Sequence, residues 1–173
     1  MKKLNVVDVV EVVYERDEVD EVAENLEPAC DEIRRAGGEA IAVVVDIRIA
    51  EQVDEMVRKS VETWGGVDIL VNNAAGNFIC PAEDLSVNGW NAVVNIVLNG
   101  TFYCSRAAGR WWIDNRRAGR ILNIVSTYAW TGGPGTVHSA SAKAGVVAMT
   151  RTLAIEWARH GIRVAAIAPG PFE

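Results

Sequence analysis

Short, nearly continuous apolar runs alternate with longer amphipathic stretches along most of this chain, and this alternation restricts its fold more than any other feature. The apolar runs predict strands at residues 40–45, 68–71, 120–125 and 162–167. The amphipathic stretches predict helices at residues 26–36, 50–63, 86–115 and 137–160. Strands that are apolar on both faces suit a parallel sheet with helices on either side. The pattern therefore predicts an α/β fold with a doubly wound parallel sheet in three layers, α/β/α.

The charge of the chain is concentrated at its beginning. Residues 1–27 hold nine acidic side chains against three basic ones, which accounts for the whole net charge of −6. The neutral remainder lacks the clustered Lys and Arg of a nucleic-acid surface, so we expect no nucleic-acid partner. We predict an atypical acidic leader over residues 1–22, whose valine-rich run 5–14 is a candidate strand, and a single domain over residues 23–173.

Composition also restricts the compartment and the metal chemistry. No run approaches the roughly 18 uninterrupted apolar residues that a membrane helix needs, so we expect a cytoplasmic protein without a membrane partner. Cys30, Cys80 and Cys104 are widely spaced and form no CxxC pair. Neither a disulfide framework nor a metal site is predicted from them.

Polar and turn residues follow the predicted strands, at the place where open α/β sheets bind their ligands. The residues at these strand ends include Asp46, Ile47, Asn73, Ala74, Ala75, Gly76, Asn77, Ser126, Tyr128, Pro169, Gly170, Pro171 and Phe172. Ser139 and Lys143 lie four apart on the helix predicted at 137–160, so they share one face of it.

Four motifs together resemble the short-chain dehydrogenase/reductase family. They are the run DILVNNAAG at 68–76, the strand end at Ser126, the helix with Lys143 and the Ala-Pro-Gly turn at 168–170. Each motif is weak alone, but all four occur in the order and spacing of the family, over about residues 23–173. The resemblance implies a Rossmann-like fold, a nicotinamide cofactor and a homo-oligomer, tetramer or dimer, formed through the two long helices.

Two positions depart from the usual pattern of that family. Ser139 stands where most members carry a catalytic Tyr, and Val97 stands where most carry an Asn. In the 2,4-dienoyl-CoA reductases of the family, the helix reads Ser-x-x-x-Lys, the Tyr follows the preceding strand, and an Asn follows the Asn-Asn-Ala-Ala-Gly turn. This chain has Tyr128 and Asn77 in those two places. It is therefore most similar to that subgroup.

The resemblance to this subgroup implies a catalytic set of Tyr128, Asn77, Ser139 and Lys143. Reduction of a dienoyl thioester sends negative charge to the thioester oxygen, where the Tyr128 hydroxyl and the Asn77 amide can donate hydrogen bonds. Lys143 is expected to bind the nicotinamide ribose, and Ser139 to support the site as a polar group. The implied substrate is an acyl-CoA, and the implied cofactor is NADP, with NAD as the open alternative. The implied cofactor-binding residues are Asp46, at the adenine, with Ile47, Asn73, Ala74, Ala75, Gly76, Ser126, Lys143, Pro169, Gly170, Pro171 and Phe172.

Three functions stay open from the sequence. The first is an NAD(P)H-dependent reductase of the dienoyl-CoA type, and the second is another oxidoreductase of the family, acting on a carbonyl or an alcohol. The third is a catalytically incompetent fragment, truncated at both ends, that keeps the fold and the oligomer interface. It stays open because no glycine precedes Gly37 and the chain stops at Glu173, just after the Pro-Gly turn. Without a Gly-rich turn the pyrophosphate loses its backbone contacts, so we expect the chain to bind NADPH weakly or not at all.

Simpler roles also stay open for single residues of the catalytic set. Tyr128 can be an ordinary loop aromatic, Asn77 can stabilise a turn, and Ser139 can cap the first turn of its helix.

Overall fold

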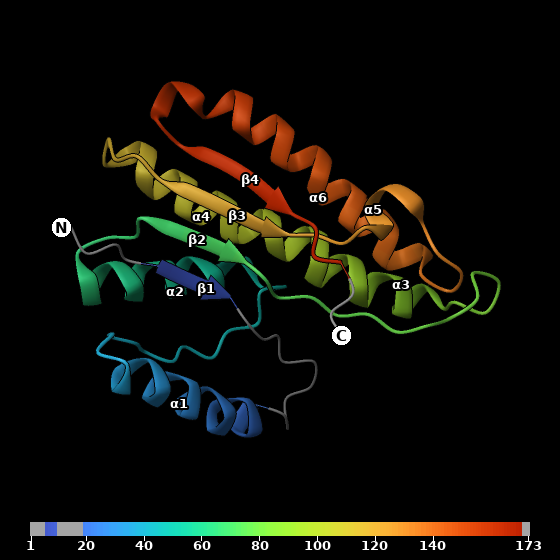
Figure 1. Ribbon diagram of the computed structural model, residues 1–173, viewed down its shortest axis with the longest axis horizontal. Coiled ribbons are helices and arrows are strands. Elements are labelled where there is room, and N and C mark those ends of the chain that lie inside the picture. The colour runs from blue at the N-terminus through green and yellow to red at the C-terminus, as the bar shows by residue number, and fades with distance from the viewer. Residues whose placement is uncertain (1–5, 10–18, 171–173) are drawn as a thin grey trace.

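The sheet of this protein has four parallel strands. The computed structural model describes the backbone of residues 6–9 and 19–170 and the side chains of residues 26–170. The strands are β1 (Val6–Val9), β2 (Ile69–Asn72), β3 (Arg120–Ile124) and β4 (Arg163–Ile167). They pair in the order β1-β2-β3-β4, and each neighbouring pair is parallel (Figure 1). The predicted α/β fold with a parallel sheet is confirmed.

The helices lie close to their predicted positions. α2 (Ala50–Trp64) and α6 (Val137–Glu156) begin at the predicted residues, whereas α1 (Val19–Arg35) begins seven residues earlier than predicted. The long helix predicted at 86–115 consists of α3 (Val87–Val94), the π-helical turn η2 (Asn95–Gly100) and α4 (Thr101–Asp114). The sequence does not predict the short helix α5 (Tyr128–Thr131), and a 3₁₀ turn, η3 (Ala158–His160), follows α6.

The N-terminal predictions reach beyond the described residues. β1 falls inside the valine-rich run 5–14. The other residues of that run lie outside the part of the chain that the structure describes. The division between a leader and a single domain at residue 22 stays a prediction.

The predicted strand at residues 40–45 is wrong. This segment is irregular, and none of the described strands lies beside it to form a hydrogen-bonded ladder. Its apolar side chains serve packing instead, because Val45 is buried in the core and Val43 contacts the same cluster. A continuous apolar run reports burial, but a strand also requires a neighbouring strand. Sequence pattern alone does not separate these two cases.

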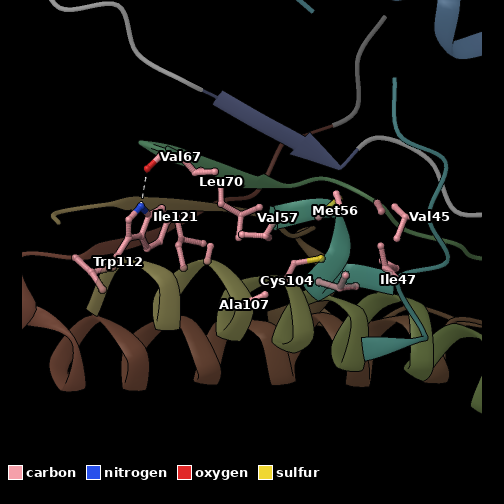
Figure 2. Close-up of a cluster of buried hydrophobic side chains, with 14 of the residues drawn as sticks. Val45, Ile47, Met56, Val57, Val67, Leu70, Cys104, Ala107, Trp112 and Ile121 are labelled. Carbon is pink, nitrogen blue, oxygen red and sulfur yellow. Dashed lines mark hydrogen bonds between the residues drawn. The ribbon is translucent and has the colours of Figure 1, made fainter. Parts of the chain in front are cut away.

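One face of the sheet carries the main core. Figure 2 shows β2 and β3 above α4, with Leu70 and Ile121 directed toward Ala107 and Trp112 of that helix. Helices α2, α4 and α6 all lie on this side of the sheet (Figures 1 and 2). Because successive side chains of a strand point to opposite faces, the neighbours of these core residues lie on the other face, where they are half-buried or exposed.

A buried polar network ties the middle of the sheet to this helical layer. The Asn72 amide on β2 donates to Asn123 Oδ1 on β3 at 2.8 Å and to Ser105 Oγ on α4 at 3.0 Å. Asn123 Nδ2 then donates to Thr150 Oγ1 on α6 at 2.8 Å. All four side chains are buried. The network therefore holds β2, β3, α4 and α6 in one relative position, directly before the carboxyl ends of the strands.

Thr150→Val tests the contribution of this network to stability. We expect the free energy of unfolding to fall by about 1–3 kcal/mol, because the change leaves the buried Asn123 amide without its acceptor. Thr152→Val is the matched control. The Thr152 hydroxyl donates to the carbonyl oxygen four residues earlier in α6, as the Thr150 hydroxyl does, but Thr152 is exposed. We expect it to change stability by less than about 0.5 kcal/mol. Equal losses in urea denaturation of the two variants would contradict the assignment.

Candidate active site

The predicted catalytic residues gather around the carboxyl ends of β2 and β3 and the beginning of α6. Asn77 lies on the loop after β2, and Tyr128 is the first residue of α5, shortly after β3. Ser139 and Lys143 lie on the first two turns of α6. α5 packs directly against α6. This contact places the helix that carries Tyr128 beside the helix that carries Ser139 and Lys143.

Lys143 is the most strongly perturbed group of the set. Its side chain is only 8% exposed, and Nζ donates a hydrogen bond to the Ile124 carbonyl oxygen at 2.6 Å. Burial disfavours the charged ammonium and lowers the pKa of Lys143 from 10.5 to about 8. A buried cation at the carboxyl end of a parallel sheet is suited to bind hydroxyl groups or to stabilise a developing negative charge.

The lowered pKa of Lys143 predicts a specific pH dependence of stability. Between pH 8 and 10.5 the unfolded chain binds more protons at this residue than the folded chain, so the folded protein gains stability as the pH rises. Lys143→Met removes the gain and leaves the other titrating groups in place. We expect the wild type to gain about 3 kcal/mol over this variant between pH 7 and 10.5. A stability difference that stays constant in denaturation curves over this range would contradict the shift.

Two serines complete the buried polar part of the site. Ser139 is buried one helical turn before Lys143. Ser126 follows β3, and its buried Oγ has no hydrogen-bond partner among the described residues. Buried hydroxyl groups are normally hydrogen-bonded, so the unpaired Ser126 oxygen indicates a place for a polar atom of a ligand or a water molecule.

Tyr128 and Asn77 lie on the accessible side of these buried groups. Tyr128 is 45% exposed, and its ring lies against Gly133, where an added Cβ would approach Cε1 to 3.0 Å. Asn77 is also exposed. A phenol and an amide at the mouth of a site with a buried ammonium can together donate hydrogen bonds to an oxygen that becomes negative during a reaction.

Exposed apolar side chains lie on the segments that carry the candidate catalytic residues, and we call them the apolar rim. They come from the loop after β2, from α5 and from the first residue of α6, and they are Phe78, Ile79, Tyr128, Trp130 and Val137. The two loops are joined, since Cys80 N–H donates to the Gly135 carbonyl oxygen at 3.0 Å. Sequence reasoning missed all of the rim except Tyr128, because nothing in an apolar residue's identity shows that it will be exposed.

The predicted adenine side of the site is occupied by a local ion pair. Arg48 donates to both carboxylate oxygens of Asp46, with Nε at 2.9 and 3.0 Å and Nη2 at 2.8 Å. Burial opposes ionisation of Asp46, but the hydrogen bonds from Arg48 outweigh it and leave its pKa below the ordinary value. Ile47 is a core residue, packed under Gly100. A ligand at this position would meet the backbone of Ile47 rather than its side chain.

The remaining candidates lie on the two turns that follow β2 and β4. Ala74 is buried and Ala75 is exposed on the first turn, next to half-buried Asn73 and Gly76. Pro169 and Gly170 follow β4, and the predicted Pro171 and Phe172 lie outside the described residues. The structure therefore brings the turns after β2, β3 and β4 to one edge of the sheet. Their contact with a cofactor stays a prediction.

Val97 lies at the centre of the π-helical turn η2 and is fully buried in a second apolar cluster. Its carbonyl oxygen accepts a hydrogen bond from Thr101 Oγ1 at 2.7 Å. On the same turn, Asn99 Nδ2 donates a hydrogen bond to Asn95 Oδ1 at 2.8 Å. Single π-turns often occur at functional sites. Val97, however, is an apolar core residue and offers no polar side chain to a site.

A cavity of about 340 Å³ lies at the other end of the strands. Residues at the beginning of β3 and β4 line it, among them Arg117, Arg120 and Arg163. None of the candidate catalytic residues borders this cavity. Its volume therefore does not identify the place of the chemistry.

Comparison with known proteins identifies the family of this chain. The profile of the family described as short chain dehydrogenase matches residues 15–173. The chain belongs to the short chain dehydrogenase family, as its motifs predict. Within the described part of the chain, no helix is long and apolar enough to cross a membrane.

Individual relatives add detail. The chain is 54% identical, over 151 residues, to a protein of Bacillus subtilis (strain 168) named probable 2,4-dienoyl-CoA reductase, (2E)-enoyl-CoA-producing. It is 43% identical over 136 residues to a Danio rerio protein named peroxisomal 2,4-dienoyl-CoA reductase, (3E)-enoyl-CoA-producing. These matches cover 87% and 78% of this chain but only 59% and 45% of the relatives.

A solved structure shows the same fold. The crystal structure of a short chain dehydrogenase from Bacillus anthracis matches with a TM-score of 0.78 and 50% sequence identity. The match covers 96% of this chain and 66% of that chain. The parallel sheet and its helices are therefore those of the family, over the part that this chain spans.

Proposed function

We propose that this chain carries the catalytic half of an NAD(P)H-dependent reductase that acts on an unsaturated acyl thioester, as 2,4-dienoyl-CoA reductases do. One observation supports it above the others. The position on α6 usually held by the family's Tyr is Ser139, and the phenol of the site comes from Tyr128 on α5, which packs against α6. Because a phenol is present on the neighbouring helix, the absence of Tyr at position 139 favours an altered chemistry over a lost one.

The residues present suit the nicotinamide half of a cofactor. Lys143 supplies a buried ammonium, and Ser126 supplies a buried hydroxyl without a partner among the described residues. We propose that these two side chains bind the ribose and the ring, with the turns after β2 and β4 beside them. When bound, NAD(P)H supplies the hydride. Nothing in Lys143 or Ser126 selects NADP over NAD, and the proposal of NADP rests on the resemblance.

Tyr128 and Asn77 act on the substrate oxygen in this proposal. Hydride uptake by the dienoyl chain moves an electron pair toward the thioester oxygen, and the Tyr128 hydroxyl and Asn77 amide donate hydrogen bonds to it. Lys143, as a cation, stabilises the same negative charge. A proton from Tyr128 or from water then completes the reduced chain. Ser139, buried one turn before Lys143 on α6, supports the site as a polar group.

The apolar rim and the relatives support an acyl thioester as the substrate. Five exposed apolar side chains at the mouth of the site offer contacts to a hydrocarbon chain, which would remove them from water. Two of the relatives carry the name 2,4-dienoyl-CoA reductase. Fatty-acid metabolism is the corresponding context.

We also propose a homo-oligomer and a cytoplasmic location. Exposed apolar side chains on the long helices, Phe102 on α4 and Ile155 on α6, offer contacts between copies. The three cysteines are free, which suits a reducing compartment.

The test is a titration of the purified chain with NADPH, followed by turnover of a 2,4-dienoyl-CoA at the absorbance of the cofactor. Saturable binding with turnover supports the proposal. Turnover of a ketone or alcohol substrate, but not of the dienoyl thioester, would replace it by a different oxidoreductase function. A folded chain that binds no cofactor would overturn the proposal for this chain.

A further inference from the structure

The first turn of α6 carries a buried imidazole that the proposed reaction does not use. His138 is fully buried, and neither ring nitrogen has a hydrogen-bond partner among the described residues. Ala142 and Val146 follow on the same face of α6 and belong to an apolar cluster with Val93. An apolar side chain would suit this position, because a buried donor or acceptor without a partner carries its full desolvation penalty. The imidazole therefore calls for a functional explanation.

Phe78 covers this imidazole. The two ring centroids are 4.5 Å apart, with an angle of 50° between the ring planes. On another side Phe78 meets α3, because a Cβ added at Gly89 would lie 3.0 Å from Phe78 Cζ. The ring is thus held between α3 and α6. Asn77 precedes Phe78 directly, so the position of its amide depends on where His138 and Gly89 hold the Phe78 ring.

The backbone N–H and carbonyl groups of the loop that contains Phe78 are available for further hydrogen bonds. Among the described residues, no backbone hydrogen bond involves residues 77–79, and the first one after them joins Cys80 to Gly135. Within the described part of the chain, the backbone groups of this exposed loop pair with no other backbone group, and the two imidazole nitrogens have no partner. An imidazole can both donate and accept, so it can pair with either kind of backbone group.

We propose that His138 is a positioning residue for Asn77. Its ring supports Phe78, and a ring nitrogen forms a hydrogen bond with the backbone of the 77–79 loop when an acyl thioester is bound. The hydrogen bond holds the Asn77 amide at the thioester oxygen. His138 itself does not touch the substrate. The inference rests on the proposed function, since it assigns a support to one of the groups that bind the thioester.

The first test measures binding of a saturated acyl-CoA, which cannot be reduced, to the full chain by calorimetry. We expect His138→Leu to weaken binding about tenfold, which corresponds to one lost hydrogen bond. His138→Gln keeps a donor and an acceptor, and we expect it to restore binding to within about threefold of the wild type. In an Asn77→Ala background, His138→Leu should have no further effect, because the two residues act as one unit.

His160→Gln is the control, since His160 lies in η3 and accepts a hydrogen bond from Arg159 Nε at 3.1 Å. It should bind the acyl-CoA as the wild type does. Unchanged binding by His138→Leu would overturn the inference and leave the proposed function intact. An equal loss in the Asn77→Ala background would overturn it too, because the effect would not act through Asn77. A wild-type chain that binds no acyl-CoA would overturn both proposals.

A second measurement needs no variant at position 138. The chain has only two histidines, so ¹⁵N signals of their rings can be assigned with His160→Gln alone. On addition of the acyl-CoA we expect the ring nitrogen signals of His138 to move, while those of His160 stay in place. Binding of the acyl-CoA without movement of the His138 signals would overturn the inference, whatever the stability of the His138→Leu variant.

Discussion

Replacing Trp112 with Ala is expected to lower the free energy of unfolding by about 3–5 kcal/mol, the usual cost of removing a large buried aromatic side chain. Trp112 is completely buried at the centre of the main core, and its Nε1 donates to the Val67 carbonyl oxygen at 2.7 Å (Figure 2). The change leaves a cavity and an unpaired carbonyl. Because domains of this size are stable by about 5–15 kcal/mol, the variant should be near unfolding at 37 °C.

Trp130→Ala is the matched control, since Trp130 is 58% exposed on α5. We expect it to change stability by less than about 0.5 kcal/mol. Trp112→Phe keeps most of the ring but removes the N–H, so its loss should lie between those of the two alanine variants. Urea denaturation followed by circular dichroism measures all three. Similar midpoints for Trp112→Ala and Trp130→Ala would show that the main core does not depend on this ring.

Tyr128→Phe is expected to reduce kcat for a 2,4-dienoyl-CoA by about 10²–10³, the usual cost of removing one donor to a developing oxyanion. The phenyl ring can still pack against Gly133 and α5 can still contact α6, so the loss should not come from misfolding. KM should change little, because the hydrogen bond is strongest when the oxygen carries charge. Initial rates at the absorbance of NADPH measure both quantities.

Tyr103→Phe controls for the loss of a phenol as such. Tyr103 lies on α4 and packs against the main core, and it is not one of the apolar-rim residues. We expect its kcat to match the wild type. If Tyr128→Phe keeps full turnover, the oxygen is stabilised by other groups and the role proposed for Tyr128 is wrong. A rise in KM alone would indicate that Tyr128 binds the ground state and the transition state equally.

Much of the fold could be predicted from local sequence pattern. The predicted helices at 50–63 and 137–160 begin at the residues where α2 and α6 begin. For α2, amphipathic periodicity and the glycine that ends the helix are local signals. β3 and β4 lie within their predicted runs for a similar reason. The segment at 40–45 failed because a strand needs a neighbour. The sequence does not show which runs lie side by side.

The residues of the candidate site also differ in how far the sequence could predict their positions. Ser139 and Lys143 could be placed together from their spacing on one helix, and Tyr128 and Asn77 could be placed from the ends of two predicted strands. Phe78 and His138 could not, because they are 60 residues apart and meet only when the loop after β2 lies over α6. No periodicity predicts that contact.

The sequence by itself determined the family of this protein, the positions of β2, β3, β4 and most of the helices, and the chemical groups available at the strand ends. These properties depend on residue identity and on neighbours a few positions away. Tertiary structure alone decided that burial lowers the pKa of Lys143 to about 8 and that Arg48 pairs with Asp46. It also placed His138 under Phe78, with no hydrogen-bond partner among the described residues. Burial and long-range contact set these properties, and both arise only when the chain has folded.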